Sequence, residues 1–288
     1  MSLSQLVFYT FKVMKKIFII VIATLFFISC NDSQKREQDK KIPVEQDNGI
    51  GDGAPSLSTA FAQGVEKTHN KEAFLAHNNI SFDIALNFNG QERLKGTFTM
   101  RTNSSKIKFE SKDGKTIIYN GEEVYLTPKE AEMESARFDI LTWPYFMAMP
   151  FKLTDGGTIW SDVKQVTEKN RDYSKAKLTF EAGVGDTAED WYQVYVDNNT
   201  NLLNYAAYIV TFGKSVTKAE QEPHAILYEN YVVIDAIAIS DTWKFYNWSE
   251  EKGLYGEPIG DATLSNIQFL ESADYTVPKN AKKIEAPN

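Results

Sequence analysis

A strict alternation of apolar and polar residues constrains the fold of this chain more than any other feature. From residue 80 to residue 88, every second side chain is large and apolar: Ile80, Phe82, Ile84, Leu86 and Phe88. This period of two places the five side chains on one face of a β-strand and leaves the other face to water. The pair Asn89-Gly90 follows directly and favours the positive φ angles of a tight hairpin turn. The sequence therefore predicts an antiparallel hairpin with one buried face.

The same signals, short apolar runs separated by turns, continue along the chain. Leu94, Phe98 and Met100 form the return strand, and glycine turns follow at residues 113–114 and 120–121. Further strands are predicted at residues 176–180, 191–196, 202–212, 224–231, 234–246 and 262–269. Roughly ten to twelve strands with two helical insertions indicate a mainly β, α+β domain with one curled antiparallel sheet. We expect this single domain to occupy residues 57–288.

Two helical segments are expected to interrupt the strands. Apolar residues at helical spacing after Ser56, a suitable N-cap, predict a short helix that ends near Asn70. Residues 127–130 (Thr-Pro-Lys-Glu) have the form of a capping box, so a second helix is expected to start there and to stop before Pro144. The segment 138–153 is rich in aromatic and methionine residues but contains two prolines, which predicts an irregular apolar segment. It is either core filling or the cover of a ligand.

The start of the chain has the pattern of an export signal. Met14-Lys15-Lys16 precedes an apolar run at residues 17–28, which is short for a membrane-spanning helix and typical of a secretory signal. Residues 1–29 are therefore predicted to be a signal peptide, with residues 1–13 as a possible start-site extension. The alternative is an N-terminal anchor helix that is never cleaved.

The apolar run ends at the only cysteine of the chain, Cys30. Residues 27–30 (Phe-Ile-Ser-Cys) resemble the lipobox of bacterial lipoproteins. This resemblance implies that Cys30 carries acyl chains such as palmitate and anchors the protein to a membrane, on the periplasmic side or the cell surface and at the outer membrane. Two or more acyl chains hold a protein firmly on a bilayer. Residues 30–56 are polar and predict a flexible tether.

Charge and missing motifs exclude several functions. The formal charge is −8, and removal of residues 1–29 would take away three lysines and no acid, giving −11. An acidic chain without a basic patch argues against nucleic acid as a partner. His69 and His77 lack the spacing of metal ligands, and we expect them to be solvated at helix ends. No nucleophile elbow, phosphate loop or dinucleotide motif occurs, so no enzymatic activity, metal or cofactor is predicted.

An aromatic group near the end of the chain offers a second type of site. It surrounds a polar turn at residues 249–253 and contains Trp243, Phe245, Tyr246, Trp248 and Tyr255. Exposed aromatic faces beside carboxylates would suit a glycan- or peptide-binding accessory lipoprotein. The same residue types are also preferred on any half-buried sheet.

Two strand pairs carry a family resemblance. Residues 191–197 (WYQVYVD), followed by 200–203 (TNLL), resemble a hairpin of the bacterial lipoprotein carriers (LolA/LolB-like). Residues 228–231 and 234–239 look like the next strand pair, with Ala236 where the family has glycine and Ser240 where proline is common. The whole chain is similar to uncharacterised bacterial lipoproteins of this size. The resemblance implies a strongly curved, half-open antiparallel sheet, or half-barrel, with helices in or across its concave face.

Relatives with this fold hold acyl chains in the concave hollow. We therefore predict a membrane-anchored, non-enzymatic protein that binds a lipid, an acyl chain or another hydrophobic small molecule. The predicted ligand-binding residues are Phe82, Ile84, Leu86, Phe98 and Met100 on the sheet, and Phe138, Trp143, Phe146, Met147 and Met149 in a plug or lid.

Overall fold

The computed structural model describes residues 55–286. The predicted signal peptide, the Cys30 anchor and nearly all of the tether lie outside these residues. The described part contains the helices α2 (Leu57–His69), α3 (Lys71–Ala76), α4 (Ala136–Ala148) and α5 (Val216–Ala219), and the 3-10 turn η1 (Met149–Phe151). The strands are β1 (Asn79–Phe88), β2 (Gln91–Arg101), β3 (Ile107–Ser111), β4 (Thr116–Tyr119), β5 (Val124–Thr127), β6 (Thr158–Glu168), β7 (Arg171–Phe180), β8 (Tyr192–Asp197), β9 (Leu203–Tyr208), β10 (His224–Ile234), β11 (Ile237–Ser249), β12 (Gly253–Leu270) and β13 (Lys282–Ile284).

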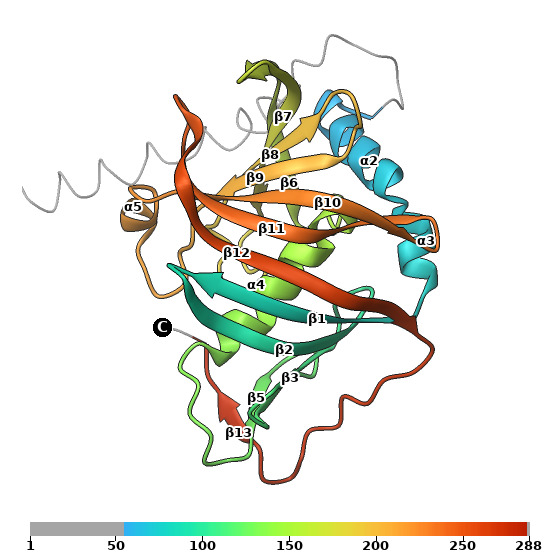
Figure 1. Ribbon diagram of the computed structural model, residues 1–288, viewed down its shortest axis with the longest axis vertical. Coiled ribbons are helices and arrows are strands. Elements are labelled where there is room, and N and C mark those ends of the chain that lie inside the picture. Colours follow the sequence, from blue (N-terminus) through green and yellow to red (C-terminus); the bar gives the residue numbers. More distant parts are fainter. Residues whose placement is uncertain (1–54, 287–288) are drawn as a thin grey trace, which may run out of the picture. The chain divides into compact units, whose positions relative to one another are not determined.

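All these strands belong to one antiparallel sheet. Their order is β13-β5-β4-β3-β2-β1-β12-β11-β10-β9-β8-β7-β6, so most neighbours in space are also neighbours in sequence. The exception at the centre is β12, which returns to pair with β1 and joins the two halves of the sheet. The edge strands β13 and β6 do not pair with each other, and the sheet curls around α4 without closing (Figure 1). The predicted curved, half-open antiparallel sheet with a helix across its concave face is confirmed.

The first hairpin follows the sequence prediction closely. β1 and β2 pair with Ile80 opposite Met100 and Phe82 opposite Phe98, and the two phenylalanine rings lie 5.5 Å apart. Both turn residues, Asn89 and Gly90, have positive φ angles of 50° and 73°. The turn therefore has the geometry that matches the natural twist of a two-stranded ribbon.

The helix predictions have different outcomes. α2 is confirmed: the Ser56 hydroxyl accepts a hydrogen bond from the Thr59 amide, and Asn70 ends the helix in the left-handed conformation. The capping-box prediction is wrong, because Thr127 is the last residue of β5 and pairs with Thr116. The second helix, α4, begins at Ala136 and continues through Pro144 to Ala148. Its burial on several sides offsets the hydrogen bond that proline removes from a helix.

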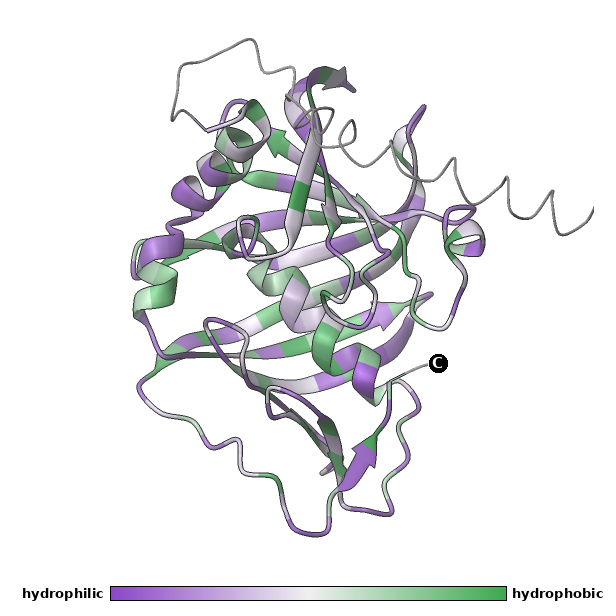
Figure 2. Ribbon diagram, turned by 180° about the vertical axis from the view of Figure 1, so that it is seen from behind, coloured by the Kyte–Doolittle hydropathy of each residue, from purple (hydrophilic) through white to green (hydrophobic). Residues whose placement is uncertain are grey.

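The segment 138–153 is regular and not irregular as predicted, and most of it fills the core. α4 and η1 lie against the concave face of the sheet, and Figure 2 shows hydrophobic and hydrophilic residues alternating along the strands of that sheet. Ile140, Trp143, Met147 and Met149 are buried among the inward side chains of the strands. Within residues 55–286, no helix is long and apolar enough to cross a membrane.

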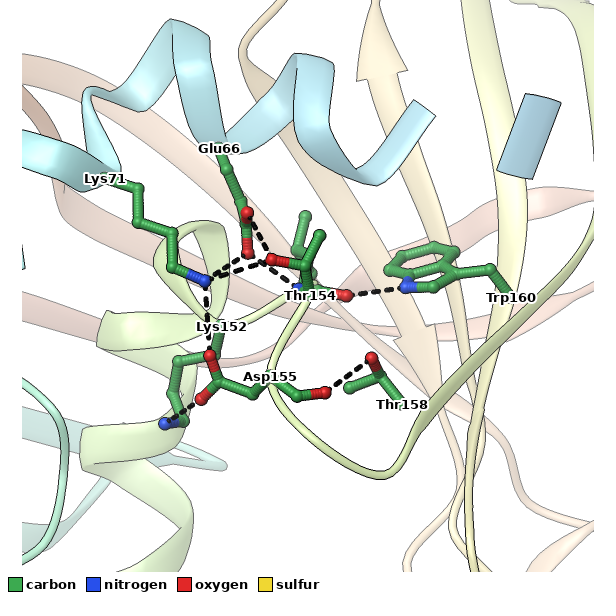
Figure 3. A network of polar contacts seen from close by, with 8 residues as sticks. Glu66, Lys71, Lys152, Thr154, Asp155, Thr158 and Trp160 are labelled. Atoms are coloured by element: carbon green, nitrogen blue, oxygen red, sulfur yellow. Dashed lines mark hydrogen bonds and ion pairs between the residues drawn. The ribbon is translucent and has the colours of Figure 1, made fainter. Parts of the chain in front are cut away.

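α2 is fixed to one end of the concave face by charged and polar contacts (Figure 3). The Glu66 carboxylate accepts hydrogen bonds from the Thr154 amide and hydroxyl, both at 2.7 Å, and from the Lys71 ammonium at 2.8 Å. Asp155 bridges the ammonium groups of Lys71 and Lys152. Because Glu66 is buried and all its partners are charged or polar, this network holds α2 against the turn that follows η1.

Candidate functional site

A cavity of about 400 Å³ remains between α4 and the two arms of the curved sheet. We call it the aromatic cavity; its main wall residues are Phe138, Leu141, Tyr145, Phe146, Tyr192 and Tyr208. One side of the wall comes from β3 and β4, and the opposite side comes from β8, β9 and the loop before β8. This volume lies in the range of small-molecule sites in proteins.

One face of α4 forms the floor of the aromatic cavity. Phe138, Leu141, Thr142 and Tyr145 recur at the spacing of one helical face, and all four are half-buried while the remaining α4 residues are buried. A helix on the surface of a core normally carries charged or polar residues on its outer face. Here three of the four residues on the outer face are aromatic or aliphatic and the fourth is Thr142, so mainly apolar surface faces an open space.

The wall opposite α4 is built from two tyrosines that pair across strands. Tyr192 of β8 lies directly opposite Tyr208 of β9, and their ring centroids are 6.1 Å apart. Tyr145 lies 5.7 Å from the Tyr192 ring, and Phe146 lies 5.0 Å from the Tyr208 ring. Burial raises the pKa of the Tyr145, Tyr192 and Tyr208 hydroxyls, so all three stay protonated at neutral pH.

Charged groups at the rim are paired. Arg137, at the start of α4, binds both carboxylate oxygens of Asp186 and donates a third hydrogen bond to the Ile284 carbonyl. Lys152 is the basic residue of the cavity wall, and its ammonium lies 2.6 Å from the Asp155 carboxylate. Arg137, Asp186 and Lys152 are therefore all held in ion pairs at the edge of the aromatic cavity.

The other end of the hollow is closed by α2. His69 is fully buried: its Nδ1 donates to the Ala238 carbonyl at 3.0 Å, and its Nε2 accepts from the Leu203 amide at 3.1 Å. Burial lowers the pKa of His69 to about 4. The prediction that His69 is solvated is wrong, because the ring joins α2 to β9 and β11. Among residues 55–286, no group of three His, Cys, Asp or Glu residues is arranged to hold a metal ion.

The predicted ligand-binding residues fall into two groups, one in the cavity wall and one in the core. Phe138 and Phe146 line the aromatic cavity. The other eight are at most 4% exposed and pack together in the core beneath the helix: Phe82, Ile84, Leu86, Phe98, Met100, Trp143, Met147 and Met149. The sequence analysis had not singled out Leu141, Tyr145, Tyr192 and Tyr208. The spacing of Leu141 and Tyr145 from Phe138 would have placed them on one helical face with it, but the sequence carries no local signal that brings Tyr192 and Tyr208 to that face.

The alternative aromatic platform is not an exposed surface. Trp243 and Phe245 point into the main core, whereas Trp248 packs on the opposite face of the sheet with Tyr195 and Tyr205. All three are buried, Tyr246 is half-buried, and Tyr255 is 39% exposed. The period of two along β11 explains this result, because residues that are neighbours in sequence alternate between the two faces.

Comparisons with known proteins find a family model and distantly similar solved structures. A family model of unknown function, DUF6503, matches residues 141–255. No curated protein matches the chain. A LolA superfamily protein from Nitrosomonas europaea is 11% identical over 75% of this chain and 97% of its own length, with a TM-score of 0.49. A DUF1329 family protein from Desulfovibrio piger is 12% identical over 74% of this chain and 92% of its own, with a TM-score of 0.41.

The matches include both kinds of protein that the sequence resembles, an uncharacterised family and structures with a lipoprotein-carrier-like fold. The fold assignment itself comes from the strand order, the unpaired edges and the helix inside the curl.

Proposed function

We propose that this protein is an exported, membrane-anchored lipoprotein that binds a hydrophobic small molecule or acyl chain in the aromatic cavity and catalyses no reaction. The observation that supports this proposal best is the apolar outer face of α4. Phe138, Leu141 and Tyr145 line the aromatic cavity and keep part of their surface exposed. Covering this surface with an apolar ligand would release about 25 cal/mol for each Å² removed from water.

The test is binding of a fluorescent apolar probe, N-phenylnaphthylamine, to the purified full chain. Leu141→Lys places a charge in the cavity wall, and Leu141 is half-buried, so the fold has room for the new side chain. We expect this variant to lose probe binding at least tenfold, about 1.4 kcal/mol or more. The matched control is Val233→Lys, which places the same charge at a 72% exposed apolar residue of β10. Equal binding by both variants and the native chain would exclude the aromatic cavity as the site.

Anchoring through Cys30 is tested separately. The motivation is the single cysteine at the end of an apolar run. Metabolic labelling with an alkyne fatty acid should mark the native chain and leave Cys30→Ser unlabelled. The labelled chain should sediment with membranes, because two acyl chains bind a bilayer firmly. Labelling that survives the substitution would contradict the proposed anchor.

A further inference from the structure

The aromatic cavity contains polar groups that the surrounding protein does not use. Within residues 55–286, the hydroxyls of Tyr145, Tyr192 and Tyr208 form no hydrogen bond with another residue. Tyr192 and Tyr208 are each only 7% exposed. Tyrosines at this depth normally place the hydroxyl on a partner. Tyr228, for comparison, donates its hydroxyl to the Phe146 carbonyl at 2.9 Å.

These hydroxyls are not sealed within the protein. In the described part of the chain, the side-chain polar atoms that are both sealed from solvent and unpartnered are Ser104 Oγ, Gln193 Oε1, Asn204 Oδ1, Trp243 Nε1 and Trp248 Nε1. No tyrosine hydroxyl is among them. The three tyrosines line the aromatic cavity, so we infer that their hydroxyls face its free space.

A carboxylate lies in the same wall. Asp190 is buried, and its Oδ1 accepts hydrogen bonds from the Thr211 amide and hydroxyl, both at 2.7 Å. Burial raises the pKa of Asp190, and the hydrogen bonds from Thr211 oppose this rise by favouring the ionised form. Among residues 55–286, no lysine or arginine forms an ion pair with Asp190, and the ammonium of Lys152 is already paired with Asp155. The cavity therefore offers three neutral hydroxyls and one unpaired acid, with no free cation in its wall.

We propose that these groups hold the uncharged, hydrogen-bonding head of an amphiphile, such as the hydroxyl of a long-chain alcohol or a monoacylglycerol, and reject a fatty carboxylate of the same length. This inference rests on the proposed function. A hydroxyl head can accept from a tyrosine and donate to Asp190, so both types of wall group are satisfied. A carboxylate head can only accept, and its charge is repelled by Asp190 in a site of low dielectric.

The test compares dodecanol, dodecanoic acid and dodecane with the full chain at neutral pH, by displacement of N-phenylnaphthylamine. We expect dodecanol to bind at least about tenfold more tightly than dodecanoate and than dodecane, since an unmade buried hydrogen bond and an unpaired charge both cost affinity. Stronger or equal binding of dodecanoate would overturn the head-group assignment while leaving the hydrophobic site intact. Failure of all three to displace the probe would overturn the proposed function as well.

Variants test the contributions of the Asp190 carboxylate and of the tyrosine hydroxyls to binding separately. Asp190→Asn keeps an oxygen for Thr211 and removes the charge, so we expect dodecanoate to gain about tenfold in affinity. Tyr192→Phe and Tyr208→Phe should weaken dodecanol and leave dodecane unchanged. Tyr255→Phe, outside the cavity, is the matched control and should alter none of the three. Loss of dodecane binding in the phenylalanine variants would mean that the hydroxyls only maintain the cavity shape, which contradicts the proposal.

Discussion

Arg137 and Asp186 form a two-bonded ion pair that joins the first turn of α4 to the loop between β7 and β8. Arg137 Nη2 lies 2.8 Å from Asp186 Oδ1, and Nε contacts Oδ2. Their side chains are only 10% and 16% exposed. The Asp186 carboxylate raises the pKa of Arg137. Because Asp186 also lines the aromatic cavity, this pair fixes the cavity rim to the helix beneath it.

Breaking the pair should destabilise the protein. We expect Asp186→Asn to lower the free energy of unfolding by about 1–3 kcal/mol, because Arg137 would remain partly buried with one strong partner fewer. Urea denaturation measures the change. The control is Glu92→Gln, which removes a surface partner of Lys95 and should leave the urea midpoint unchanged. Equal midpoints for both variants would show that the rim pair adds no stability.

His69 should make stability depend on pH. Its pKa is lowered from 6.5 to about 4, so the folded chain keeps the ring neutral while the unfolded chain binds a proton below pH 6.5. The contribution of the neutral ring to the free energy of unfolding is therefore fully present above pH 6.5. It is lost as the pH falls toward 4, by up to roughly 3 kcal/mol. Urea denaturation of the native chain and His69→Gln over this range measures the loss, which the variant should lack. His77→Gln is the control and should keep the pH dependence of the native chain. If His77→Gln instead showed the same pH profile as His69→Gln, the assignment of the pH dependence to His69 would be contradicted.

The β10–β11 turn should tolerate glycine better than its native residue. Asp235 and Ala236 have φ angles of 50° and 64°, so Ala236 occupies the left-handed region that disfavours a Cβ atom. We expect Ala236→Gly to raise the free energy of unfolding by about 0.5–1 kcal/mol.

The reciprocal change is Gly90→Ala in the β1–β2 turn. No atom lies within 4 Å of the added Cβ, so only the φ angle of 73° opposes it. We expect Gly90→Ala to lower the free energy of unfolding by about 1 kcal/mol, measured by thermal or urea denaturation. A loss of stability in Ala236→Gly would show that the left-handed turn does not strain Ala236.

Met147 should behave as a core residue although it was predicted to bind ligand. It is buried and does not line the aromatic cavity. We expect Met147→Lys to prevent folding, because it buries a charge. Met147→Ala should lower the free energy of unfolding by about 2–4 kcal/mol, because removal of the buried side chain leaves an unfilled space. Circular dichroism and urea denaturation check this, with Leu141→Ala as the control in the cavity wall. A folded Met147→Lys that only loses probe binding would place Met147 in the site.

Patterns within short stretches of the sequence were sufficient to predict several elements of the fold. The alternation in residues 80–88 and the Asn89-Gly90 turn predicted the first hairpin, and Ser56 predicted the start of α2. Such features depend on a few neighbouring residues, whose φ preferences and side-chain directions are set locally. The error at residues 127–130 has the opposite origin, because Thr127 is held in β5 by its partner Thr116 on β4.

The sequence by itself determined a mainly β domain, since the period of two along the strands is a property of adjacent residues. Only the tertiary structure decided where the hollow is. Every apolar side chain of β1, β2 and α4 fits a core or a ligand site equally well by composition. The packing of α4 on the strands covered Phe82 and Met147, and it left Leu141 and Tyr145 facing Tyr192 and Tyr208 from a distant part of the chain. Burial depends on such long-range contacts, which no local pattern specifies.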